Sequence, residues 1–153
     1  MIKEVAFGIA NRHHFMSEDE IKRWKGTTDT FTSLYSYDDY VLEYFKEKKT
    51  LAGFDGKIYM PREFYFDVDG DSSERARQLT IGLCEYLKEF DITYRLYFSG
   101  TGFHIGVSQG IFKWEPSTEL HLRVKDCLTS NGIFTFADSS VIDKTRIIRL
   151  TNT

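Results

Sequence analysis

Cysteine, which can cross-link a chain, and proline, which interrupts helices and strands, are scarce in this sequence. It has two cysteines and two prolines among 153 residues. Cys84 and Cys127 are too few and too far apart to form a disulfide framework or a zinc site, so we expect both to be reduced. No stretch approaches the roughly 18 apolar residues of a membrane span, and the first residues lack the features of a signal peptide. We therefore expect a soluble cytoplasmic protein with no membrane partner; a nuclear or viral setting is the alternative.

An excess of basic residues is also missing, because 20 Lys and Arg stand against 23 Asp and Glu and give a net charge of −3. A protein that binds nucleic acid through the electrostatic attraction of its whole surface needs a dense basic surface. The composition therefore argues against that mode of binding. A local basic track beside an acidic site is still compatible with the total, since charges of both signs can be segregated within one domain.

Hydrophobic residues make up 41% of the chain and aromatic residues 16%, with 13 Phe and 9 Tyr. This composition is typical of a folded protein with many β-strands. The length suits one domain, and the sequence contains no internal repeat and no low-complexity linker. We expect residues 1–153 to form a single compact domain. The chain stops directly after an apolar run, which predicts a fragment of a longer protein.

The spacing of apolar residues predicts an α+β fold with one, mostly antiparallel sheet. Strands are expected at residues 4–9, 63–68, 93–98, 103–107, 133–136 and 146–150, and helices at about 17–25, 38–49, 71–90 and 116–129. Ser17 and Glu20 have the spacing of a capping box, and Asp71 is expected to cap the third helix. Three polar clusters would then fall at strand ends of this one sheet.

The first polar cluster follows an apolar run and reads Asp67-Val68-Asp69-Gly70. Side chains two residues apart in a strand point to the same face, so Asp67 and Asp69 can share a divalent cation. Two neighbouring carboxylates repel each other unless a cation or a proton neutralises them. One alternative is a solvated turn, where Asp is common. Another is a phosphatase of the haloacid dehalogenase type, with Ser99 as its second motif.

The second polar cluster, residues 99–104, lies between two expected strands and contains a Ser-Gly-Thr-Gly turn. Gly100 and Gly102 allow the backbone N–H groups of the turn to approach a phosphate closely. Ser99 adds a hydroxyl, and His104 can offer an imidazole proton to the same anion. The alternative without a ligand is a β-hairpin whose histidine packs or hydrogen-bonds locally.

The third polar cluster begins at Asp138, after an expected strand, and continues to the end of the chain. A carboxylate in this place could be a third metal ligand, and Arg146 and Arg149 could hold phosphate oxygens in fork geometry. The alternative is a charged hairpin in which Arg146 pairs with Asp143, a surface contact of little energetic value.

In this order, the three clusters resemble the archaeo-eukaryotic primase superfamily. The members of that superfamily have an apolar strand ending in Asp-x-Asp, then Ser-Gly-x-Gly-x-His or similar, then Asp followed by an Arg-x-x-Arg strand. The matching residues here are Asp67-Val68-Asp69, the segment 99–104, Asp138, Arg146 and Arg149. The specificity lies in the ordered triple, which covers residues 63–153.

The resemblance implies an RRM-like catalytic sheet with flanking helices and an N-terminal α/β unit. It also implies that Asp67, Asp69 and Asp138 ligate two catalytic Mg²⁺ or Mn²⁺ ions. The family spacing favours Asp138 over Asp143, which is the fallback. The residues implied in nucleotide binding are Ser99, Gly100, Gly102, His104, Arg146 and Arg149.

The activity implied by the resemblance is that of a DNA primase or primase-polymerase. Such an enzyme transfers a nucleotide from an NTP or dNTP to a 3′-hydroxyl on a single-stranded DNA template and releases pyrophosphate. A fused or associated helicase or other replication domain is a further expected partner. Two alternatives stay open: the phosphatase, with Asp67 as nucleophile and Asp69 as acid and base, and a catalytically silent nucleic-acid-binding module.

Overall fold

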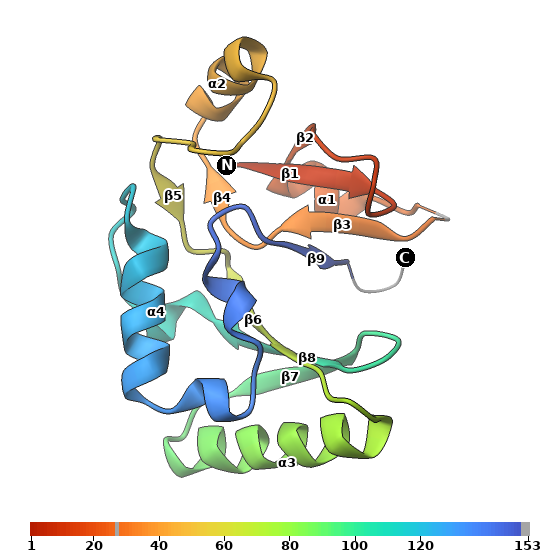
Figure 1. The fold of residues 1–153 in the computed structure, drawn as a ribbon. Helices are drawn as coiled ribbons and strands as arrows, with labels where there is room; N and C mark the ends of the chain where they lie inside the picture. Colours follow the sequence, from red (N-terminus) through yellow and green to blue (C-terminus); the bar gives the residue numbers. More distant parts are fainter. Residues whose placement is uncertain (27, 151–153) are drawn as a thin grey trace. The chain divides into compact units, whose positions relative to one another are not determined.

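The computed structural model describes residues 1–26 and 28–150, and it confirms the α+β class (Figure 1). Contacts divide the chain into two compact units. The first unit comprises residues 1–60, 115–120 and the described chain from 143 onward, and the second comprises 61–114 and 121–142. That the whole chain acts as one domain stays a prediction. No helix within the described ranges is long and apolar enough to cross a membrane.

The described part of the first unit contains a six-stranded sheet in which every pair is antiparallel. β1 is central and pairs with β2, β3 and β4, while β5 and β9 extend the sheet on either side. The bounds are β1 Ile2–Phe7, β2 His14–Ser17, β3 Thr30–Ser33, β4 Ser36–Tyr37, β5 Ile58–Tyr59 and β9 Ile147–Arg149. β1 and β9 confirm two expected strands; the four others were missed.

Two helices belong to the first unit, and both confirm expectations. α1 (Glu18–Arg23) begins with the predicted capping box, because Glu20 N–H donates to Ser17 Oγ at 3.2 Å and Ser17 N–H donates to the Glu20 carboxylate at 2.7 Å. α2 (Tyr40–Lys48) ends where Lys49 adopts a left-handed conformation with φ 57°.

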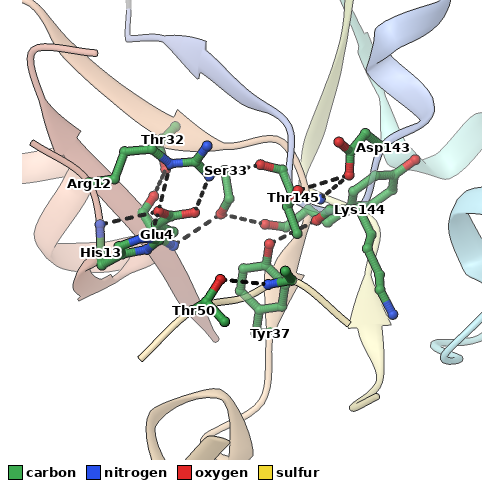
Figure 2. Close-up of polar contacts among 12 residues, drawn as sticks. Glu4, Arg12, His13, Thr32, Ser33, Tyr37, Thr50, Asp143, Lys144 and Thr145 are labelled. Carbon is green, nitrogen blue, oxygen red and sulfur yellow. Dashed lines mark hydrogen bonds and ion pairs between the residues drawn. The ribbon is translucent and has the colours of Figure 1, made fainter. Parts of the chain in front are cut away.

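A buried carboxylate joins the start of the chain to the segment before β9 (Figure 2). Glu4 is fully buried, and Arg12 donates to its two oxygens at 3.0 and 2.8 Å. Arg12 also donates to the Thr145 carbonyl at 3.1 Å, and Tyr37 donates its hydroxyl to the Lys144 carbonyl at 2.8 Å. A buried charge needs such compensation, so this network fixes the register of segments far apart in sequence.

The second unit contains a three-stranded antiparallel sheet in the order β6-β8-β7. Its strands are β6 Glu63–Val68, β7 Tyr94–Phe98 and β8 Phe103–Ser108, and its long helices are α3 Ser73–Glu89 and α4 Leu120–Ser130. One face of the sheet is apolar, with Phe64, Phe66 and Ile105 buried. The alternation of side chains leaves polar residues on the opposite face.

Two expected helix starts are wrong. α3 is capped by Ser72 rather than Asp71, because Arg75 N–H donates to Ser72 Oγ at 3.2 Å. α4 begins at Leu120 rather than Pro116. Ser117 forms a β-bridge with Ile58 instead, through backbone hydrogen bonds of 3.1 and 3.3 Å.

The strand expected at residues 133–136 is also wrong, because these residues form the 3₁₀ helix η2 (Ile133–Thr135). It follows Gly132 at φ 66°, and Thr135 N–H donates to the Gly132 carbonyl at 3.1 Å. A short apolar run does not distinguish a strand from a helical turn. Since β9 pairs with β3 in the first unit, the three polar clusters do not lie on one sheet.

Candidate active site

The polar face of the second unit's sheet carries two rows of side chains that run across its three strands. In the first row, Asp67 of β6 pairs with His104 of β8, and His104 pairs with Tyr97 of β7. In the second row, Tyr65 pairs with Gly106, which pairs with Arg95. Antiparallel pairing aligns opposite residues on the same face, so these side chains are neighbours.

Asp67 and His104 form a buried pair in the first row. Asp67 is 7% exposed and His104 is 6% exposed, and His104 Nε2 lies 3.4 Å from Asp67 Oδ1. The sequence placed both residues near a phosphate or metal but could not give their register. The antiparallel pairing of β6 and β8 brings them together.

Asp69 lies beyond the end of β6 and is exposed, and the Gly-rich turn packs directly against it. A Cβ atom placed on Gly102 would overlap Asp69 Oδ1 and the Val68 carbonyl oxygen. This position therefore requires glycine, because any side chain would push the turn away from the acid. The closeness of the two expected clusters at this point follows from the pairing of β6 with β8, in which Val68 lies opposite Phe103.

Some of the backbone N–H groups of the turn at residues 99–102 donate hydrogen bonds within the turn itself. Ser99 N–H donates to the Gly102 carbonyl at 3.0 Å, and Gly102 N–H donates to Ser99 Oγ at 3.1 Å. Gly100 has φ 108°, a conformation that favours glycine. Two hydrogen bonds thus close the turn, and phosphate binding by Ser99, Gly100 and Gly102 stays a prediction.

Asp138 lies next to Asp67 in the second unit. Its N–H donates to the Asp67 carbonyl at 2.7 Å. Its carboxylate accepts hydrogen bonds from Ser140 N–H at 2.9 Å and Ser140 Oγ at 2.5 Å, at the start of the 3₁₀ helix η3 (Ser139–Ile142). The backbone bond places the third predicted acid beside the first two, although no strand precedes it.

A hollow of about 400 Å³ lies in the second unit, and two of the predicted acids line it. The lining consists of one side of α3 and the segments that carry these acids: Asp69, Gly70, Leu79 and residues 134–138. The volume falls within the range of small-molecule sites, and its lining combines carboxylates with apolar side chains.

Carboxylate oxygens are the ligands that Mg²⁺ and Mn²⁺ prefer, so Asp67, Asp69 and Asp138 fit such cations chemically. Across residues 1–26 and 28–150, however, no three His, Cys, Asp or Glu side chains converge in a group that could hold a metal ion. A backbone hydrogen bond joins Asp138 to Asp67, and Asp138 shares the hollow with Asp69. A cation would have to draw their carboxylates closer together.

The remaining predicted residues lie in the first unit. Arg149 of β9 donates to Asp29 at 3.0 Å, and its guanidinium lies 5.6 Å from the centre of the Phe31 ring. Arg146 N–H donates to the Asp143 carbonyl at 3.0 Å, and the Asp143 carboxylate accepts from Thr145 N–H at 2.8 Å. Asp143 therefore caps a turn in the first unit, whereas Asp138 belongs to the unit of Asp67 and Asp69.

Four residues of the polar sheet face were not predicted: Glu63, Tyr65, Arg95 and Tyr97. The Glu63 carboxylate accepts hydrogen bonds from the Tyr65 hydroxyl at 2.9 Å and the Tyr97 hydroxyl at 3.3 Å. Burial and then the hydrogen bond to Glu63 raise the pKa of Tyr65. The signal was available, because a period of two from Asp67 places Tyr65 and Glu63 on the same face.

Comparison of the chain with protein-family models, curated proteins and solved structures gives no significant match. The functional assignment therefore depends on the residues of the chain itself.

Proposed function

We propose that the chain is the catalytic core of a template-directed nucleotidyltransferase, a primase or primase-polymerase that uses Mg²⁺ or Mn²⁺. The observation that supports this most is a chain of pairwise contacts in the second unit: Asp67 lies against His104, the Asp138 N–H donates to the Asp67 carbonyl, and Asp138 lines the same hollow as Asp69. These residues lie up to 71 positions apart, since 138 − 67 = 71. These contacts between distant positions do not follow from composition.

In this proposal, Asp67, Asp69 and Asp138 hold the cations, and their exposure suits different tasks. Bound cations would supply the positive charge that activates a 3′-hydroxyl and compensates the leaving pyrophosphate. Asp69 is exposed and can reach a substrate, whereas Asp67 is buried against His104. Asp138 is anchored by its N–H to the Asp67 carbonyl.

His104 and Ser99 position the phosphates of the incoming nucleotide. His104 can donate an imidazole proton to an oxygen that gains negative charge, and Ser99 is held by a hydrogen bond in the turn beside Asp69. Correct placement of reacting groups alone accounts for a large part of the rate in phosphoryl transfer. The resemblance also implies that Arg146 and Arg149, which lie in the first unit, contact triphosphate or template, and this stays a prediction.

The proposal predicts that isosteric loss of one carboxylate charge abolishes nucleotide addition and preserves the fold. We would measure extension of a primed single-stranded DNA template by labelled NTPs and dNTPs in Mg²⁺ and in Mn²⁺. Asp67→Asn, Asp69→Asn and Asp138→Asn should each lower the rate at least about 100-fold, because each removes a charge that the developing negative charge requires.

Asp143→Asn is the matched control, because it changes an acid of the same segment that caps a turn in the first unit. It should retain nearly the wild-type rate. Loss of activity in Asp143→Asn together with full activity in Asp138→Asn would show that Asp143, not Asp138, is the third metal ligand. Unchanged synthesis in Asp67→Asn would contradict the proposal altogether.

The same samples test the two alternatives. Metal-dependent hydrolysis of a phosphomonoester without nucleotide addition would favour the phosphatase. That reaction would need a later lysine together with a Gly-Asp-type acidic pair, and the lysines after Ser99, Lys113, Lys125 and Lys144, have no such motif. Template binding without either reaction would favour a silent binding module.

A further inference from the structure

Two tyrosine rings stand together on the polar sheet face, beside the Asp67–His104 pair. The rings of Tyr65 and Tyr97 lie 5.7 Å apart between centres and are tilted by 58°. The Tyr65 ring also lies 6.2 Å from the His104 ring. Both tyrosines are half-buried, so each keeps some surface exposed to solvent.

The strand between the two tyrosines has no side chain at this place, because Gly106 of β8 lies opposite Tyr65. A Cβ atom on Gly106 would overlap the Glu63 carboxylate, which lies over the strand. Glycine thus lets Glu63 reach both tyrosine hydroxyls. It also leaves the rings in contact across the middle strand.

Glu63 holds the two rings in fixed orientations by accepting a hydrogen bond from each hydroxyl. Arg95 approaches the same carboxylate, with Nη1 3.6 Å from Glu63 Oε2, and its side chain is 75% exposed. The pair of rings is therefore pre-organised, and a cation lies at its rim. Pre-organisation lowers the entropy that a ligand must offset on binding.

We propose that Tyr65 and Tyr97 form a stacking shelf that receives one unpaired nucleobase of the substrate, next to Asp67 and His104. The inference rests on the proposed function and deepens it. A base stacked on one ring meets the edge of the other, and Arg95 contacts the attached phosphate. Stacking tolerates every base, because each has a π-face. An enzyme that copies any template needs such tolerance.

The nucleobase can come from the template strand or from the incoming nucleotide, and two probes separate these sources. The first is an oligothymidylate with one 2-aminopurine, and the second is 2-aminopurine riboside triphosphate. Stacking quenches the fluorescence of 2-aminopurine, so each titration gives both an affinity and a test of stacking. We would use the whole chain in Ca²⁺, which binds carboxylate and phosphate oxygens, and compare the variants below.

Tyr65→Leu and Tyr97→Leu should weaken binding of at least one probe by about fivefold or more and reduce the quenching, because the aromatic face is lost. Tyr65→Phe and Tyr97→Phe keep the ring but lose the hydroxyl that donates to Glu63, so they should keep the quenching and weaken binding less than the leucine variants do. Loss with the oligonucleotide alone assigns the template base, and loss with the triphosphate alone assigns the incoming nucleotide.

Tyr97→Trp provides a second measurement that does not depend on the leucine variants folding. Its added indole emission should fall when unlabelled oligothymidylate or ATP binds. Unquenched emission, wild-type affinity in folded leucine variants, or no binding of either probe to the wild-type chain would each overturn the shelf. If the shelf is overturned but the chain still adds nucleotides to a primer, the proposed function is unaffected. Quenching without nucleotide addition would support base stacking on Tyr65 and Tyr97 and would contradict the proposed polymerase activity.

Discussion

At the scale of single residues, Lys3 shows how burial sets the charge balance of the first unit. Lys3 is buried in β1 and donates to the carbonyls of Ser33 and Leu34 at 2.7 and 2.9 Å. Burial lowers the pKa of Lys3 from 10.5 to about 8, and the negative charge of Glu18 partly opposes this shift. The folded chain therefore releases this proton at lower pH than the unfolded chain does.

The sign of the resulting pH dependence follows from proton binding. Between pH 8 and the unfolded pKa of 10.5, the unfolded chain binds more protons at Lys3, so stability rises with pH. We expect the free energy of unfolding to rise by about 1.5 kcal/mol from pH 8 to pH 9.5, relative to Lys3→Met. Urea denaturation of both proteins at these pH values measures the difference. Parallel pH profiles would show that burial does not shift the titration of Lys3.

Among the site residues, the sequence identified the chemical types but not all of their neighbours. Asp67 and Asp69 were predicted from strand periodicity, and the structure adds the contacts of His104 with Asp67 and of Gly102 with Asp69. These contacts depend on the register of β6 and β8, which local sequence does not specify. Tyr65 lies within the same alternation and could have been included.

At the scale of secondary-structure elements, the length of the apolar pattern decided which predictions were right. β6 matches its predicted bounds at residues 63–68, because six alternating residues carry a clear period. β4 and β5 have two residues each and show no period, so they were missed. Their positions depend on tertiary pairing with β1 and with each other.

The N-terminus of α3 offers a direct test of one corrected element. Ser72→Ala removes the oxygen that accepts from Arg75 N–H and should lower the free energy of unfolding by about 1 kcal/mol. Asp71→Ala is the matched control, and it should change stability by only a few tenths of a kcal/mol, since Asp71 is not the capping residue. Chemical denaturation measures both. A larger loss of stability in Asp71→Ala than in Ser72→Ala would show that Asp71 caps α3, as the sequence predicted.

At the scale of the whole molecule, the net charge does not indicate where the proposed functional residues lie. The net charge of −3 gives no general attraction for nucleic acid, so binding must come from local groups. The second unit provides the acids, His104 and the two tyrosines, whereas Arg146 and Arg149 belong to the first unit. The division of the chain into two units could not be inferred from composition, because no Pro-rich or Gly-rich linker marks it.

The central claim is that the chain copies a template, and the choice of nucleotide tests it most directly. Four primed single-stranded DNAs that differ only in the next template base would be incubated with each labelled nucleotide in Mn²⁺, beside Asp67→Asn. We expect the wild-type chain to add the complementary nucleotide in each case and Asp67→Asn to add none. Addition independent of the template base, or equal addition by Asp67→Asn, would contradict the claim.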